Sequence, residues 1–156
     1  MKSTTEEAKE LRQELKSKLG VNSRQVSVRS EYFSMGSSID VRIKDADVSL
    51  PAVREIASKY ESIRRCEFSG EILSGGNTYL SVEYTREALQ TRSDRVREQV
   101  ENAVAKLPED SNTLERVEGT DYWVGRRNGR YSVWGEESHI SAAYDVDGIC
   151  SVIVSQ

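Results

Sequence analysis

The sequence predicts an α+β protein in which antiparallel sheets are covered on one face by helices. Three stretches with apolar residues at helical spacing alternate along the chain with stretches in which apolar and polar residues alternate one by one. Small or turn-forming residues interrupt each alternating stretch, as expected for hairpins. A hairpin with one apolar face buries that face under a helix, so this repeated order predicts a layered arrangement.

The chain opens with a predicted helix. It covers residues 4–19 and carries an apolar stripe at Ala8, Leu11, Leu15 and Leu19. Ser3 with Glu6, or Thr4 with Glu7, would form a capping box at its start. Gly20 would end the helix, because glycine readily adopts the left-handed conformation that follows many helices.

A first hairpin follows this helix. Its strands are predicted over residues 25–30 and 38–44, with Val26, Val28, Ile39, Val41 and Ile43 facing inward. The small residues 34–38 between the strands, SMGSS, could form a turn or an anion-binding cradle. We favour a turn with a positive φ at Gly36, because anion cradles usually precede a helix and these residues precede a strand.

A second helix and a second hairpin come next. Ser49 would cap the helix, with Pro51 in its first turn. The buried stripe of this helix would comprise Val53, Ile56, Ala57, Tyr60 and Ile63. The hairpin would span residues 66–84, turn at residues 74–77 and place Leu80 in the core.

The last part of the chain repeats the pattern. A third helix within residues 86–107 would bury Val96, Val100, Val104 and Leu107 and would end at Pro108. A polar connector leads to a third hairpin over residues 120–135, where Asn128-Gly129 is a strong two-residue turn pattern. The tail would turn at residues 145–148. We expect residues 149–154 to form a buried strand, although periodicity alone does not distinguish a continuous apolar run from a helical turn.

The length of 156 residues bounds the domain organisation. Such a chain fits one domain, or one compact domain with an appended part. We therefore expect a core domain over residues 1–85. Residues 86–156 would be an extension of that domain or a small subdomain.

Composition indicates a soluble cytoplasmic protein. Charged residues make up 31% of the chain, the net charge is -4, and no apolar run approaches the ~20 residues that span a membrane. The acidic, polar N-terminus does not resemble a secretory signal. Cys66 and Cys150 lie far apart and are expected to be reduced thiols. The chain lacks the overall basic excess of a dedicated DNA-binding domain.

Several segments resemble a known family. Residues 8–16 (AKELRQELK), 26–43 (VSVRSEYFSMGSSIDVRI) and 70–79 (GEILSGGNTY) are similar to the large polyvalent protein-associated domain family of the type numbered 29. The resemblance covers roughly the first half of the chain, up to about Tyr84. It implies a setting in phage, prophage or plasmid proteins, often beside domains delivered with mobile DNA. It assigns no catalytic residue.

No catalytic, metal or cofactor site is predicted. His139 is the only histidine, and neither Cys66 nor Cys150 lies in a recognisable catalytic motif. A metal site would need more histidine or cysteine ligands than the chain has. The Asp145–Gly148 segment is too short for a calcium loop. We interpret His139 as a partly exposed strand residue.

Polar side chains share the outer face of the first hairpin. Arg29, Asp40 and Arg42 are expected to project from its paired strands on the solvent side. The simplest interpretation is a cross-strand ion pair worth a few tenths of a kcal/mol, roughly. The functional alternative is a polar face that docks a partner.

The third hairpin gathers aromatic and basic residues. With Asn128-Gly129 as its turn, Arg127 would pair with Arg130 and Trp123 with Trp134. Alternation places these four residues on one side of the hairpin, opposite Val124 and its partner Val133. The valine side is the better candidate for packing on the third helix, so the two tryptophans and two arginines would face outward. Cross-strand stabilisation explains the aromatic residues, whereas base stacking or a protein contact would use the same residue types.

These observations favour a small, non-enzymatic binding protein of a mobile genetic element. A protein partner is expected, such as a component of a host defence complex that the protein inhibits or modulates. The alternative is a nucleic-acid-associated accessory protein that uses the basic aromatic hairpin. No membrane partner is expected, and the oligomeric state is left open.

Overall fold

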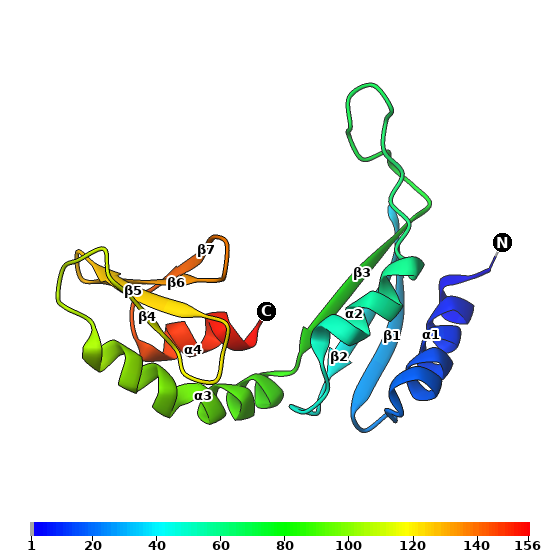
Figure 1. Ribbon diagram of the computed structural model, residues 1–156. Coiled ribbons are helices and arrows are strands. Elements are labelled where there is room, and N and C mark those ends of the chain that lie inside the picture. The colour runs from blue at the N-terminus through cyan, green and yellow to red at the C-terminus, as the bar shows by residue number, and fades with distance from the viewer. Residues whose placement is uncertain (1) are drawn as a thin grey trace. The chain divides into compact units, whose positions relative to one another are not determined.

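The computed structural model describes residues 2–156, and these residues form two compact units divided between Ala88 and Leu89. Each unit combines helices with a sheet (Figure 1), which confirms the predicted α+β class. The first unit contains α1 (Thr4–Leu19), β1 (Val26–Phe33), β2 (Gly36–Ile43), α2 (Leu50–Ala57), the short 3-10 helix η1 (Ser58–Tyr60) and β3 (Asn77–Tyr84). The second unit contains β4 (Leu114–Arg116), β5 (Trp123–Arg127), β6 (Arg130–Trp134), β7 (His139–Ala143) and α4 (Val146–Val154). Helix α3 (Arg86–Lys106) begins at the end of the first unit and continues into the second.

Helix α1 has the ends that its sequence predicts. Of the two possible capping boxes, the one between Ser3 and Glu6 forms: the Ser3 hydroxyl accepts from the Glu6 N–H, and the Glu6 carboxylate accepts from the Ser3 N–H. Gly20 ends the helix in the left-handed conformation, with φ at 66°. The predicted stripe is buried at Ala8, Leu11 and Leu15, whereas Leu19 is exposed.

The first hairpin and its inward face are confirmed. Strands β1 and β2 pair antiparallel from Val26 opposite Ile43 to Phe33 opposite Gly36, so Ser34 and Met35 form the turn. The inward residues Val26, Val28, Ile39, Val41 and Ile43 are all buried. Gly36 has a φ of 157°, and its Cα faces the backbone of Asn77 in β3. Of the SMGSS stretch, only Ser34 and Met35 form the turn. Gly36 already begins β2, where the absence of a side chain lets β2 and β3 approach closely.

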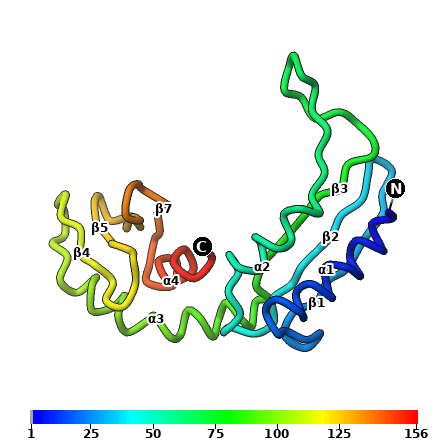
Figure 2. Tube along the Cα trace, turned by 45° about the vertical axis from the view of Figure 1, so that its right-hand side comes forward, coloured from blue at the N-terminus to red at the C-terminus, as the bar shows by residue number. Residues whose placement is uncertain are grey.

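The predicted second hairpin is wrong. Strand β3 pairs with β2 in parallel, from Gly36 beside Asn77 to Ile43 beside Tyr84, so the sheet has the order β1-β2-β3. A connection through α2 makes this crossover possible, because parallel neighbours need a long connection rather than a tight turn. The colours of Figure 2 show that the chain passes from β2 through α2 to β3. The first sheet is thus mixed rather than purely antiparallel.

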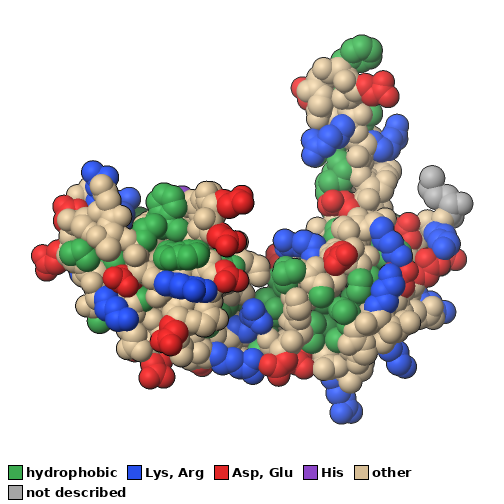
Figure 3. Space-filling view, viewed as in Figure 1, with side chains coloured by type: hydrophobic (Ala, Val, Ile, Leu, Met, Phe, Trp, Pro, Cys, Tyr) green, Lys and Arg blue, Asp and Glu red, His purple; other side chains and the backbone are tan. Residues whose placement is uncertain are grey.

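Residues 61–76, here called the arm, leave the sheet before β3 begins (Figure 1). One isolated bridge, Arg65 with Ile72, joins the two sides of the arm, and a second, Ser62 with Thr78, joins the arm to β3. The hydrophobic side chains Phe68, Ile72 and Leu73 of the arm are exposed rather than packed in a core, and Phe68 is 99% exposed. Charged side chains of both signs lie along the arm on the face shown in the space-filling view (Figure 3). The alternation in this segment predicted a strand, but no layer covers its apolar face.

Asn77 anchors the arm to the sheet. Its side chain is buried, donates to the Leu73 carbonyl at 2.7 Å and accepts from the Arg64 N–H at 2.9 Å. These two bonds connect both sides of the arm, at Arg64 and Leu73, to the first residue of β3. Buried amide groups need such partners, because an unpaired one costs about 1–3 kcal/mol.

The core of the first unit lies between its sheet and the helices α1 and α2. Among the side chains expected there, Leu11, Leu15, Val28, Ile39 and Val41 are buried, whereas Ile56, Tyr60 and Leu80 are half-buried. Val53 and Ala57 are the fully buried residues of α2. Both helices cover the one apolar face, and the opposite face of the sheet carries the polar residues.

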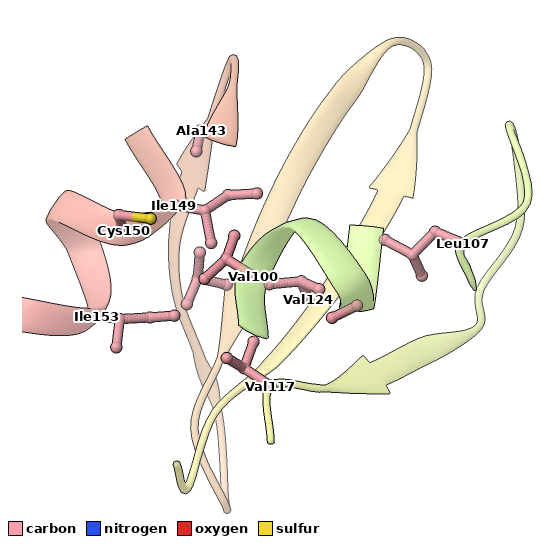
Figure 4. Packing of buried hydrophobic residues seen from close by; sticks show 10 residues of the cluster. Val100, Leu107, Val117, Val124, Ala143, Ile149, Cys150 and Ile153 are labelled. Atoms are coloured by element: carbon pink, nitrogen blue, oxygen red, sulfur yellow. The ribbon is translucent and has the colours of Figure 1, made fainter. Parts of the chain in front are cut away.

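The second unit packs its four-stranded antiparallel sheet, in the order β4-β5-β6-β7, against α3 and α4. Its core joins Val100 of α3 and Leu107, the residue that follows this helix, to Val124 of β5 and to Ile149 and Ile153 of α4 (Figure 4). Val96 and Val104 pack partly against this core. The predicted third helix and its stripe are confirmed.

Two features of the second unit differ from expectation. Residues 149–154 are helical, because the Asp145 side chain caps α4 by accepting from the Gly148 N–H at 2.7 Å. Their burial at Ile149, Cys150, Ile153 and Val154 follows helical spacing. Strands β4 and β7 lie outside the predicted hairpins, β4 in the polar connector and β7 between the third hairpin and the turn at residues 145–148, and both extend the sheet of the third hairpin.

Candidate docking surface

The third hairpin has the predicted register. Asn128 and Gly129 form the turn, with φ values of 52° and 72°, and Arg127 lies opposite Arg130. Trp123 lies opposite Trp134. Positive φ at both turn residues matches the right-handed twist of the strands, which is why Asn-Gly favours this hairpin.

The two sides of the hairpin are also as predicted. Val124 and Val133 are fully buried in the core beneath α3 and α4. Trp123, Trp134, Arg127 and Arg130 therefore share the open side of the sheet, and we call these four residues the Trp–Arg face. Both tryptophans are half-buried, and both arginines are exposed.

Neighbouring residues hold the tryptophans in place. The Trp134 indole N–H donates to the Ser132 hydroxyl at 2.9 Å, and its ring meets His139 edge-on with 5.0 Å between centroids. The Arg116 guanidinium lies 5.7 Å from the Trp123 ring centroid. Such cation–π contacts are worth about 0.5–1 kcal/mol at exposed sites. The aromatic part of the face is thus ordered before any partner arrives.

The two arginines have weaker support. Neither forms an ion pair with another residue of the described chain, 2–156, although Arg130 lies 5.3 Å from the Tyr144 ring centroid. Like charges directly opposite each other destabilise a strand pair. Asp110 lies near the turn, where its carboxylate accepts from the Asn128 N–H at 3.4 Å. Folding alone does not account for this arginine pair.

Sequence reasoning missed the residues that flank the face. Arg116 and Leu114 come from β4, and His139 comes from β7. Leu114 covers Gly125, where a Cβ atom would lie 2.8 Å from the Leu114 side chain. Residues 114–116 are Leu-Glu-Arg, which do not alternate between apolar and polar, so no local pattern indicated β4.

The polar residues of the first sheet do not form the expected ion pair. Arg29 and Asp40 are opposite each other, but Asp40 accepts instead from the Ser38 hydroxyl at 3.0 Å. Arg42 forms its ion pair with Glu83 of β3. The sequence could not predict this partner, because the parallel neighbour of β2 was not recognised.

The three residues considered for catalysis are not brought together in either unit. Cys66 lies in the arm of the first unit, whereas Cys150 and His139 lie in the second. Cys150, on α4, is completely buried in the core of the second unit, and His139 is exposed at the start of β7. The histidine is thus a strand residue, as interpreted.

The two thiols should differ in reactivity. Hydrogen bonds from the Ser69 hydroxyl and from the N–H groups of Ser69 and Phe68 lower the pKa of Cys66, whereas burial raises the pKa of Cys150. Thiolate is the reactive form, so iodoacetamide at neutral pH should alkylate Cys66 well before Cys150. Mass spectrometry of the native chain over time checks the order. Equal rates in the folded chain would contradict it.

Comparison with known proteins shows the family of this chain. Residues 2–95 match the family described as large polyvalent protein associated domain 29, and this match covers more than half of the sequence. The chain therefore belongs to that family. The matched residues include the whole first unit from residue 2 onward and the start of α3. No curated protein and no solved structure matches the chain.

Membership places the chain among domains associated with large polyvalent proteins, a description that fits a mobile-element setting. The Trp–Arg face lies beyond the matched residues. Within residues 2–156, no helix is both long and apolar enough to cross a bilayer. The family description names no ligand and no reaction.

Proposed function

We propose that this chain is a non-enzymatic binding protein of a mobile genetic element, and that it docks on a protein partner through the Trp–Arg face. The partner would be a host or element-encoded protein, such as a component of a CRISPR or restriction complex whose activity the chain inhibits or modulates. Family membership supports the mobile-element setting. The face itself supports the mode of binding.

The arginine pair carries this proposal. Arg127 and Arg130 repel each other across the hairpin, and the described chain offers neither of them a carboxylate. A partner that supplies carboxylates would turn this unfavourable pair into two favourable contacts. Tryptophan and arginine are also the residue types that contribute most to protein interfaces. The two ordered tryptophans beside the pair would form the centre of such an interface.

Nucleic acid is the second candidate partner. Exposed tryptophan beside arginine can stack on bases and contact phosphates. The net charge of -4 and the Asp110 carboxylate near the turn favour the protein partner instead. Salt separates the two candidates, because phosphate contacts weaken steeply with added salt and a largely apolar contact does not.

Charge reversal on the face tests the proposal. Arg127→Glu with Arg130→Glu replaces one like-charged pair by another, so the hairpin should be about as stable as in the parent. We expect affinity capture from a bacterial lysate, repeated with and without nuclease, to lose its specific protein partner. The matched control is Arg86→Glu with Lys106→Glu on α3, which changes the net charge equally. Unchanged capture by a folded Arg127/Arg130 variant would rule out the face. Nuclease-sensitive capture would instead favour the second candidate.

A further inference from the structure

Strand β1 presents one free edge. It lies at the end of the first sheet and pairs only with β2. The Lys44 N–H donates to the Gln25 carbonyl at 2.7 Å, which assigns the odd-numbered residues of β1 to the ladder with β2. The backbone groups of Val28, Ser30 and Tyr32 therefore point away from the sheet.

One of these outward groups already has a substitute partner. The Arg12 guanidinium, reaching from α1, donates to the Val28 carbonyl from Nε at 3.1 Å and from Nη2 at 2.5 Å. Within residues 2–156, no hydrogen bond joins the N–H of Val28 or either backbone group of Ser30 to a partner. Arg12 thus occupies the place of a donor that an added strand would supply.

A groove runs along this edge between α1 and β1. Its volume is about 660 Å³, and the buried side chains of Leu15, Val21, Val26 and Val28 line it. Four cationic residues also line the groove, namely Arg12, Lys16, Arg29 and Lys44. No carboxylate lines it, and none of the four cations forms an ion pair with a residue of the described chain.

The charge of the groove contrasts with that of the chain. The sequence has a net charge of -4, yet this groove gathers four positive side chains over an apolar floor. Unpaired charges of one sign at such a site favour a ligand of the opposite sign. A free strand edge favours an extended peptide, whose backbone can complete the unpaired groups.

We infer that the edge of β1 binds an extended acidic peptide segment of a protein partner as a fourth strand of the sheet. Alternate apolar side chains of the peptide lie on the floor formed by Val26 and Val28, and the carboxylates between them face the other side of the sheet, toward Arg29 and Lys44. When the peptide binds, Arg12 leaves the Val28 carbonyl, which then accepts from a peptide N–H. This site lies in the family-matched unit and is independent of the Trp–Arg face.

Peptide fits the groove better than single-stranded nucleic acid does. The floor is aliphatic, and no aromatic side chain lines the groove. Sequence-tolerant binding of single strands relies on aromatic side chains on which the bases stack. The free N–H and C=O groups on the strand edge match a peptide backbone, which carries both donors and acceptors.

The test uses the full chain and a fluorescent nine-residue peptide in which valine alternates with glutamate. Anisotropy should show binding, and the amides of Val28 and Ser30 should gain protection from hydrogen exchange. Lys16→Glu with Lys44→Glu should weaken binding about tenfold or more, because both charges line the groove. Lys9→Glu with Lys106→Glu changes the net charge equally away from the groove and should leave binding within about twofold.

A second variant tests the strand edge itself. Ser30→Pro removes an N–H that points outward and leaves the ladder with β2 intact, so the sheet should fold and peptide binding should be lost. Equal binding by this variant, or by a peptide interrupted by proline, would reduce the site to charge attraction and overturn the inference. Absence of binding at millimolar peptide would also overturn it. So would tighter binding of a thymidine oligonucleotide, or dimerisation that Ser30→Pro abolishes.

Discussion

Replacing Leu11 by alanine should lower the free energy of unfolding of the first unit by about 2–5 kcal/mol. Leu11 is completely buried in α1, in a core that also contains Ile39 and Val41 of β2. Removing its side chain takes apolar atoms from the core and leaves a cavity that the neighbouring elements fill only in part. Alanine favours helix, so the loss comes from packing rather than from the backbone of α1.

Leu19→Ala is the matched control for this change. Leu19 is the last residue of the same helix and is 36% exposed, so the same substitution should cost less than about 0.5 kcal/mol. Denaturation followed by far-UV circular dichroism and by hydrogen exchange of α1 amides measures both variants. Tryptophan fluorescence reports only on the second unit, because both tryptophans lie there. A Leu11→Ala effect as small as the control would contradict the core assignment.

Elements with local signals could be predicted from the sequence. Capping residues at Ser3 and Gly20 mark the ends of α1, and strict alternation marks β1 and β2. The third hairpin could be predicted to the register of each residue, because the Asn128-Gly129 turn fixes which residues face each other. In each case the information lies within a few residues of the element.

Features that depend on distant residues could not be predicted. Strand β3 finds its partner in β2 across the whole of α2 and the arm, and no local pattern distinguishes this parallel pairing from a hairpin. Alternation in the arm suggested a strand, although only a covering layer makes such a strand stable. In the tail, by contrast, a nearby residue determines the structure. The apolar run alone fits a strand or a helix, and the Asp145 cap favours the helix.

The candidate binding surfaces also have parts that could be predicted from the sequence and parts that could not. The Trp–Arg face follows from counting residues across one turn, so its four members and their side of the sheet could be predicted. Arg116 and His139 reach the face from β4 and β7, strands that join the sheet through longer connections. The groove beside β1 was not predicted at all. It depends on how Arg12 and Lys16 of α1 lie against the strand edge, which is a tertiary arrangement.

Gly36→Ala should destabilise the first unit by about 1–3 kcal/mol, which is the usual cost of overpacking. A Cβ atom at this position would lie 2.5 Å from the carbonyl oxygen of Asn77. This oxygen belongs to the backbone of β3, so it cannot turn aside as a flexible side chain would. The strands must separate where their parallel ladder begins, and Asn77 moves with them. Since the Asn77 side chain anchors the arm, proteolysis within residues 61–76 should also become faster.

Gly20→Ala is the control variant. It distinguishes the effect of the close contact at Gly36 from the effect of losing glycine's conformational freedom. Gly20 has a φ of 66°, and a Cβ atom added there would have no neighbour within 4 Å, so alanine meets only the backbone penalty of about 1–2 kcal/mol. Both variants should lower the unfolding midpoint, because both positions disfavour a side chain. Only Gly36→Ala should also speed cleavage of the arm, since only Gly36 contacts the strand that anchors it. Equal arm cleavage in the two variants would show that Asn77 does not couple the turn of the first hairpin to the arm.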